Sequence, residues 1–147
     1  MPDVSPTKWH RAHVTWFFEA FVLADHQPGF SMFQDTYWTL FNSYYESVGA
    51  RHPRANRGHI SRPGALEVGD YRRHVDDRML DLLSTRLPGE RSDGGRPEDD
   101  ALRALVSLGF HHEHQHQELL LMDIKHVLSR NPLEPVGYPG PRGAPGP

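Results

Sequence analysis

Four stretches of this chain carry apolar side chains at the spacing of an α-helix, and this pattern limits the fold more than any other feature of the sequence. No stretch shows the alternation of apolar and polar residues that is typical of a half-buried strand. The predicted helices run from Ser5 to Leu23, from Asp35 to Val48, from Ala65 to Leu87 and from Pro97 to about Arg130. Because amphipathic helices bury their apolar faces against one another, the sequence predicts an all-α protein, a four-helix bundle.

The ends of the predicted helices carry start and stop signals. Ser5 is of a residue type that caps helices, and Pro6 suits the first helical position. Gly49 follows the second predicted helix, and Pro88 with Gly89 follows the third. A solvated loop is expected from there to Gly95, before the fourth helix.

The C-terminal residues differ in composition from the rest of the chain. Residues 131–147 hold six prolines and four glycines among seventeen positions. Such a segment buries too little apolar surface to offset the entropy of ordering it. A chain of 147 residues has the size of one domain. We therefore predict a helical domain over residues 1–130 and a Pro/Gly-rich tail or interdomain linker over 131–147.

Composition and charge exclude several classes of protein. The chain has no cysteine, which excludes a disulfide framework, a thiolate metal site and a thiol nucleophile. The net charge of −3 offers no basic surface for nucleic acid. No apolar run is long enough to span a membrane, and the first residues do not form a secretory signal. We expect a cytoplasmic protein that binds neither nucleic acid nor membrane.

Eleven histidines are the unusual part of the composition. His112 and His116 are four residues apart on the last predicted helix, so their side chains lie on one face and are close enough to share a metal ion. Both belong to the apolar stripe, where an imidazole without a partner is costly to bury. His13 lies on the apolar face of the first helix and is the candidate third ligand. Three imidazoles that leave coordination positions open are typical of a catalytic metal site.

Other interpretations of these residues remain open at this point. A single histidine on a buried face is more often a hydrogen-bonded core residue than a ligand. Asp123 lies two turns beyond His116, where it either orients a ligand imidazole or is only the last polar residue before the helix ends; we favour the second interpretation. His112-Glu113-x-x-His116 also matches a zinc-protease motif, but the positions that would complete its extended form hold Leu119 and Met122.

Two arginines in the polar connection between the second and third helices are also candidate site residues. The guanidinium groups of Arg54 and Arg57 have a geometry suited to binding carboxylates. A solvated loop also explains such a segment, and from the residues alone we favour that explanation.

Four motifs carry a resemblance to a known family. The chain resembles, from Ser5 to about Arg130, the amino-terminal DinB-like domain of the ergothioneine-biosynthesis sulfoxide synthases. The motifs are Ser5-Pro6-x-x-Trp9 followed by Ala12-His13, Arg54-Ala55-x-Arg57, Tyr71-Arg72-x-His74-Val75-Asp76, and, as the most specific, His112-Glu113-x-Gln115-His116-Gln117-Glu118-Leu119.

The resemblance implies a DinB-like bundle in which His13, His112 and His116 bind a non-haem iron(II). It implies that Gln115 helps to place the trimethylated histidine substrate, hercynine. The reaction implied uses O2 to join a thiol to the imidazole ring of hercynine and to oxidise the sulfur.

The arginines acquire a role from the same resemblance. Arg54 and Arg57 match positions that bind the carboxylates of the thiol substrate, which is γ-glutamylcysteine or cysteine. Members often have an aspartate where this chain has His10, so we expect the support of His13 to differ.

The family completes its active site with a C-terminal domain that resembles formylglycine-generating enzymes and contributes a tyrosine proton donor. This sequence does not contain that domain. We therefore expect an iron-binding half that is inactive without such a domain, and we assign no catalytic residue. Two alternatives remain: a DinB-type thiol transferase or hydrolase that uses zinc or nickel, and a non-enzymatic bundle that binds a partner.

Overall fold

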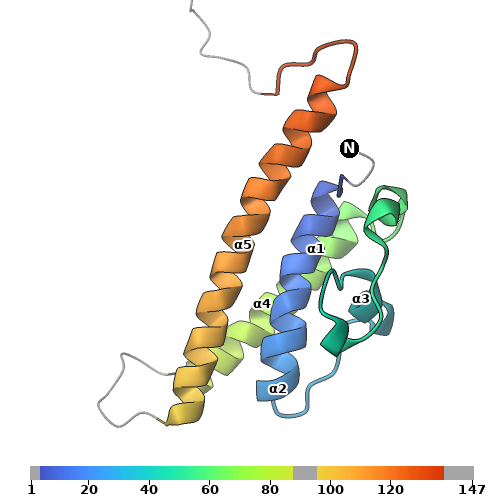
Figure 1. Ribbon diagram of the computed structural model, residues 1–147. Helices are drawn as coiled ribbons and strands as arrows, with labels where there is room; N and C mark the ends of the chain where they lie inside the picture. Colours follow the sequence, from blue (N-terminus) through green and yellow to red (C-terminus); the bar gives the residue numbers. More distant parts are fainter. Residues whose placement is uncertain (1–3, 88–95, 138–147) are drawn as a thin grey trace, which may run out of the picture.

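The computed structural model describes residues 4–87 and 96–137, and these residues form helices joined by irregular segments, with no strand. Three long helical rods lie side by side: α1 with its continuation through η1 and α2, then α4, and then α5 (Figure 1). The elements in chain order are α1 (Thr7–Phe17), the π-helical η1 (Phe18–Leu23), α2 (Ala24–His26), α3 (Asp35–Leu40), the 3-10 helices η2 (Glu46–Val48) and η3 (Arg54–His59), α4 (Ala65–Arg86) and α5 (Pro97–Ser129).

The predicted all-α class is confirmed, and so are three of the four predicted long helices. The predicted helix over residues 35–48 is wrong, because α3 ends at Leu40.

The side chain of Asn42 explains why α3 ends early. Its buried side-chain amide accepts a hydrogen bond from the backbone N–H of Tyr45 at 3.1 Å and donates to the carbonyls of Tyr45 at 3.0 Å and Gly49 at 3.3 Å. An asparagine that satisfies nearby backbone groups in this way stabilises a turn in place of a helix.

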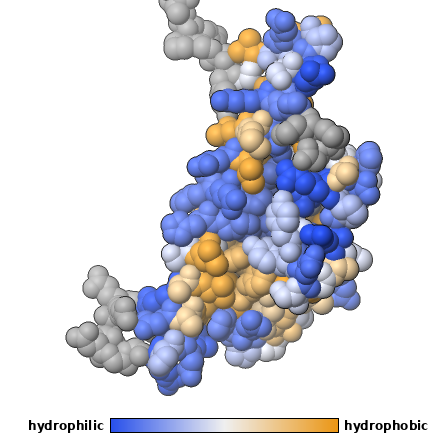
Figure 2. All heavy atoms as spheres, in the orientation of Figure 1, coloured by the Kyte–Doolittle hydropathy of each residue, from blue (hydrophilic) through white to orange (hydrophobic). Residues whose placement is uncertain are grey.

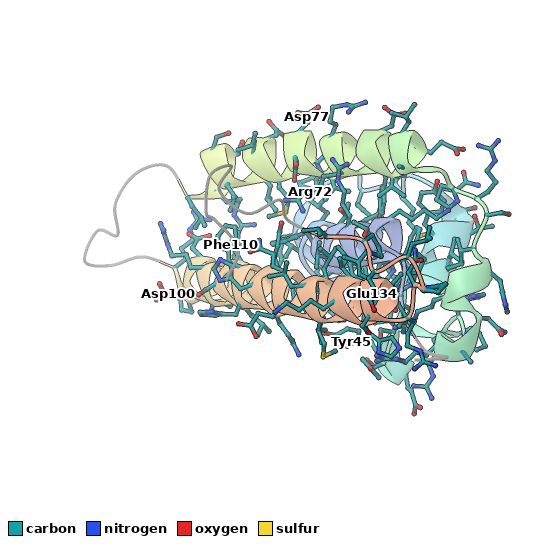
Figure 3. All side chains as sticks on the ribbon, turned by 90° about the horizontal axis from the view of Figure 1, so that it is seen from above. Tyr45, Arg72, Asp77, Asp100, Phe110 and Glu134 are labelled. Atoms are coloured by element: carbon teal, nitrogen blue, oxygen red, sulfur yellow. The ribbon has the colours of Figure 1, made fainter. Side chains whose placement is uncertain are left out.

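The core forms around α1, which contacts both α4 and α5. Figure 3 shows α1 between these two helices, with Arg72 on the inner side of α4 and Asp77 on its outer side. Large apolar side chains from all three rods are almost fully buried, among them Trp9, Trp16, Tyr71, Leu23 and Leu102.

The expected cap at Ser5 is not observed: Pro6 occupies the N-cap position, and no side chain caps the helix there.

Gly109 allows α5 to approach the first rod closely. A Cβ atom at this position would lie 2.5 Å from Cε1 of Phe18 and 3.2 Å from Cε1 of Phe17. Only glycine avoids this overlap without moving the aromatic rings. Gly109 therefore sets the distance between the two rods that carry the predicted metal ligands.

The helix α5 exposes apolar side chains in both of its halves, and Figure 2 shows apolar groups separated by hydrophilic surface. Leu108 and Phe110 belong to its first half, and Leu121, Met122, Ile124 and Val127 to its second half. No helix within residues 4–87 and 96–137 combines the length and the apolar character needed to span a bilayer. The predicted loop over residues 88–95 and residues 138–147 of the predicted tail lie outside the described residues, whereas residues 131–137 are exposed.

Candidate metal centre

The structure brings the three predicted ligands together. His13 projects from α1, and His112 and His116 project from successive turns of α5. One nitrogen from each ring lies within 4.8 Å of the corresponding nitrogens of the other two. His13 is fully buried, and the other two are partly buried. His111 and His114 are exposed, as their positions on the helix predict. The cluster has the residue types and the spacing to bind one metal ion.

The orientation of His13 is set by the irregular segment after α3. Its Nδ1 donates a hydrogen bond to the carbonyl oxygen of Phe41 at 2.6 Å. The neutral ring therefore carries its proton on Nδ1 and keeps the lone pair of Nε2 for a ligand bond. The imidazole also stacks on the Trp9 indole, with ring centroids 4.8 Å apart and planes 10° apart. A metal-ligating histidine is held in this way when its second nitrogen binds a backbone carbonyl.

His112 contributes a buried ring nitrogen, Nδ1, without a hydrogen-bond partner to the cluster. Burying an imidazole nitrogen without a partner destabilises a protein by about 1–3 kcal/mol. A cation bound between the rings would satisfy the cluster, so the donor set fits a divalent metal that prefers imidazole ligands.

Burial keeps the cluster uncharged near neutral pH. It lowers the pKa of His13 well below its usual value, and nearby His116 lowers it further. Burial also lowers the pKa of His116 to about 3, with His112 and His10 adding to the effect. The pKa of His112 is lowered by burial. Neutral imidazole is the form that binds metal, so no proton has to be removed before an ion binds at pH 7.

His10 and Asp123 lie next to the cluster. His10 Nε2 is 3.1 Å from Asp123 Oδ2, and His10 Nδ1 is 2.9 Å from His116 Nδ1. The interpretation of Asp123 as the last polar residue of its helix is wrong, because Asp123 is 4% exposed and α5 continues to Ser129. The hydrogen bonds of His10 go to Asp123 and His116, so this residue supports His116 and not His13.

The other predicted site residues line the same cavity as the histidines. A cavity of about 250 Å³ is bounded by the cluster together with Arg54, Arg57 and Gln115. Arg57 is 2% exposed, so the preferred explanation of a solvated loop is wrong for this residue. Its Nη1 and Nη2 donate to the hydroxyls of Ser5 at 3.3 Å and Ser43 at 2.8 Å.

The two arginines differ in their surroundings. The guanidinium carbon of Arg57 lies 3.6 Å from the ring centroid of Trp9, which is a cation–π contact. Arg54 is partly exposed and donates to the Tyr44 hydroxyl at 2.8 Å. The cavity therefore has a rigid buried cation in its wall and a second, more accessible one beside it.

No known protein family matches this chain, and no curated protein matches it either. The chemistry of the cavity is therefore the basis on which a function can be assigned.

The arrangement of Glu113 is unlike that of a protease base. Both of its carboxylate oxygens accept hydrogen bonds from Arg72 at 3.2 Å. Glu113 and Arg72 line a different cavity, of about 580 Å³, between α1, α4 and α5. The carboxylate that a zinc protease would use is thus engaged in an ion pair with α4.

Sequence reasoning missed the hydrogen bonds of His10 to His116 and Asp123, and it missed Ser43 and the Phe41 carbonyl altogether. His10 lies three residues before His13 on the same helix, which was a usable signal. Ser43 and Phe41 follow a helix that ends early, and no pattern in the sequence points to their place beside the histidines.

Proposed function

We propose that this chain is the iron(II)-binding half of an oxygen-dependent sulfoxide synthase of ergothioneine biosynthesis, with His13, His112 and His116 as the metal ligands. The observation that carries the proposal is the convergence of these three neutral imidazoles beside a cavity lined by Arg54 and Arg57. The resemblance of the motifs supplies the identity of the metal and of the substrates. Three imidazole ligands on an octahedral ion leave three positions for substrates, and iron(II) supplies activation of O2 when bound.

The side chains around the cavity match the chemistry of the proposed substrates. Hercynine and the thiol, cysteine or γ-glutamylcysteine, both carry carboxylates, which arginine binds through two parallel hydrogen bonds. Arg54 is accessible enough to bind a carboxylate directly, and the buried Arg57 makes the cavity positive. Gln115 lies at the wall and offers an amide to hercynine.

The proposed reaction balances without a further oxidant. The imidazole carbon loses hydrogen and gains sulfur, which removes two electrons from the substrates. Oxidation of the sulfur to a sulfoxide removes two more. Dioxygen accepts all four electrons, because one oxygen atom enters the sulfoxide and the other leaves as water.

Substrate binding to the iron-loaded chain tests the proposal. Protein loaded with Fe(II) under anaerobic conditions is titrated with hercynine in a calorimeter. We expect saturable binding that weakens by about tenfold in Gln115→Ala, through loss of a hydrogen bond, and is unchanged in the exposed control His114→Ala. Absence of binding by iron-loaded wild-type protein would contradict the proposal.

Oxygen uptake distinguishes the proposal from a zinc or nickel thiol transferase or hydrolase. Uptake that requires hercynine and a thiol together supports a sulfoxide synthase, whether it occurs with this chain alone or only after a formylglycine-generating-type domain is added. Transfer or hydrolysis of a thiol compound by zinc- or nickel-loaded protein without O2 supports the alternative.

A second candidate function is the binding of a partner domain, and the exposed apolar side chains of α5 favour it. Leu121, Ile124 and Val127 lie in the second half of the helix, close in sequence to His116 and Asp123. Exposed apolar groups of this kind often mark protein interfaces. Ultracentrifugation of the wild-type chain and of Ile124→Glu, each mixed with a formylglycine-generating-type domain, tests whether these side chains mediate association.

A further inference from the structure

Asp123, His10 and His116 form a hydrogen-bonded chain that ends at the metal cluster. His10 lies between the other two, and both of its ring nitrogens are engaged. His10 and Asp123 are 5% and 4% exposed, so both side chains are largely shielded from bulk solvent. The backbone N–H of Ser5 donates to the same Oδ2 atom of Asp123 at 3.1 Å, which fixes the carboxylate from a second direction.

The direction of each hydrogen bond follows from what these groups can donate. An ionised carboxylate only accepts, so the Nε2 atom of His10 carries a proton and donates to Asp123. In a neutral His10 the Nδ1 atom is then an acceptor. The Nδ1 atom of His116, 2.9 Å away, must therefore carry the proton and donate to His10. This leaves the lone pair of His116 on Nε2, where it is available to a metal ion.

The reverse direction would disable the ligand. If His10 donated from Nδ1, His116 would carry its proton on Nε2 and have no lone pair there for a metal. A neutral His10 would then also present an unprotonated Nε2 to an anionic carboxylate, which places two acceptors together. Asp123 therefore sets the direction of both hydrogen bonds, although its link to the cluster passes through His10.

We propose that His10 and Asp123 are positioning residues that hold His116 in the tautomer able to bind metal. This inference rests on the proposed metal-binding role of the three histidines. His13 achieves the same result through the Phe41 carbonyl, so two of the three ligands have their ring protons directed away from the ion. An outer partner of this kind raises the basicity of a ligand imidazole and fixes its ring.

Nitrogen NMR of the metal-free wild-type protein tests the inference without any substitution. In ¹⁵N-histidine-labelled protein at pH 7.5, we expect His116 to carry its proton on Nδ1, the tautomer that free imidazole side chains disfavour. His10→Phe removes the acceptor, and the His116 signal should then move toward the Nε2-protonated form. Finding His116 protonated on Nε2 in the wild-type protein would overturn the inference.

Fe(II) affinity provides a second measurement. In Asp123→Asn the side-chain amide can donate to His10 and reverse the direction of both hydrogen bonds. We therefore expect Fe(II) to bind about 10–100-fold more weakly. His10→Phe should weaken binding to a similar degree, and the double variant should be no weaker than Asp123→Asn alone, because both act through His116. Glu118→Gln, an exposed carboxylate substitution on the same helix, is the control and should bind Fe(II) as the wild type does.

The outcomes separate this inference from the proposed function. Wild-type protein that binds no Fe(II) would overturn the proposed function, and the positioning role with it. Wild-type protein that binds Fe(II), together with folded His10 and Asp123 variants of unchanged affinity, would overturn only the positioning role. Circular dichroism establishes that each variant is folded, and the wild-type nitrogen spectrum decides the tautomer if a variant is not.

Discussion

Two regions of the molecule build the candidate metal centre in different ways. The rods α1 and α5 contribute the three histidines through regular helical spacing, with His112 and His116 four residues apart on one face. The segment over residues 41–57 contributes its surroundings through individual hydrogen bonds, from the Phe41 carbonyl to the Arg57 guanidinium. The rods are stabilised by packing, and the segment by buried polar groups such as Asn42.

A metal site needs ligands at the right spacing and also ligand rings in the right orientation, and the two regions supply these two properties separately. Regular helices place ligands at a repeatable spacing, but they do not by themselves orient an imidazole ring or surround it with charge. Irregular backbone presents free carbonyls and side chains from unrelated positions, which is why the orientation of His13 depends on a segment outside both rods. We expect substitutions in the rods to remove the metal, and substitutions in the segment to change its surroundings.

The largest effect should follow from removing a ligand from either rod. His13→Ala, His112→Ala and His116→Ala should each reduce iron content from one ion per chain to less than about a tenth of that, because two imidazoles rarely retain an ion that needs three. Elemental analysis after anaerobic loading measures this.

The exposed histidines of α5 provide the control for that experiment. His111→Ala and His114→Ala should bind iron as the wild type does, and the helical circular dichroism of all five variants should match. Full iron content in the three ligand variants would rule out the triad.

Removing Asn42 should have the next largest effect, and it should be confined to the irregular segment. Asn42→Ala removes the hydrogen bonds that this buried side chain makes with the backbone of Tyr45 and Gly49, which should lower the free energy of unfolding by about 1–3 kcal/mol. Hydrogen exchange should show faster exchange over residues 41–57 than over α1 and α5.

Asn56→Ala, an exposed asparagine of the same segment, should leave both stability and exchange unchanged. Equal loss of protection across the rods in Asn42→Ala would show that the two regions do not differ in the way described.

Acid should destabilise the metal-free protein through the buried histidines of the rods. Burial lowers the folded-state pKa of His13 and His116, so below about pH 6.5 the unfolded chain binds protons that the folded chain does not. Stability therefore falls as the pH decreases, and it is constant above the unfolded pKa. His13 alone should account for about 1 kcal/mol between pH 6.5 and 5.5.

Urea unfolding at a series of pH values measures this dependence. His13→Gln should show a weaker dependence than the wild type. A wild-type stability that is independent of pH from 7.5 to 5 would contradict the neutral, buried state of the cluster.

The smallest effect is expected at the contact between the rods. Gly109→Ala forces the Phe18 ring to move, which costs about 1–3 kcal/mol, but it also gains about 1 kcal/mol of helix propensity. The net loss should be about 1 kcal/mol, measured by urea unfolding. Gly58→Ala, where an added Cβ meets no atom within 4 Å, is the matched substitution in the segment. If Gly58→Ala lowered the free energy of unfolding more than Gly109→Ala does, this prediction would be wrong.

The sequence by itself determined the helical class, the approximate extent of the long rods and the three candidate metal ligands, because helical periodicity is a local property. Spacing alone places His112 beside His116, and the apolar face of the first helix indicates that His13 points inward. Gln115 became a candidate through the resemblance, which also supplied the substrate roles of Arg54 and Arg57, and all of these roles stay predictions.

Only the tertiary structure decided how the site is supported. The early end of α3, the burial of Arg57 and the chain from Asp123 through His10 to His116 all depend on contacts between residues far apart in the sequence. Asp123 and His10 are separated by 113 positions, so no local pattern could show that they share a proton. Hydrogen bonds between distant elements form only after packing has brought them together, and for that reason the surroundings of a ligand are less predictable from sequence than the ligand itself.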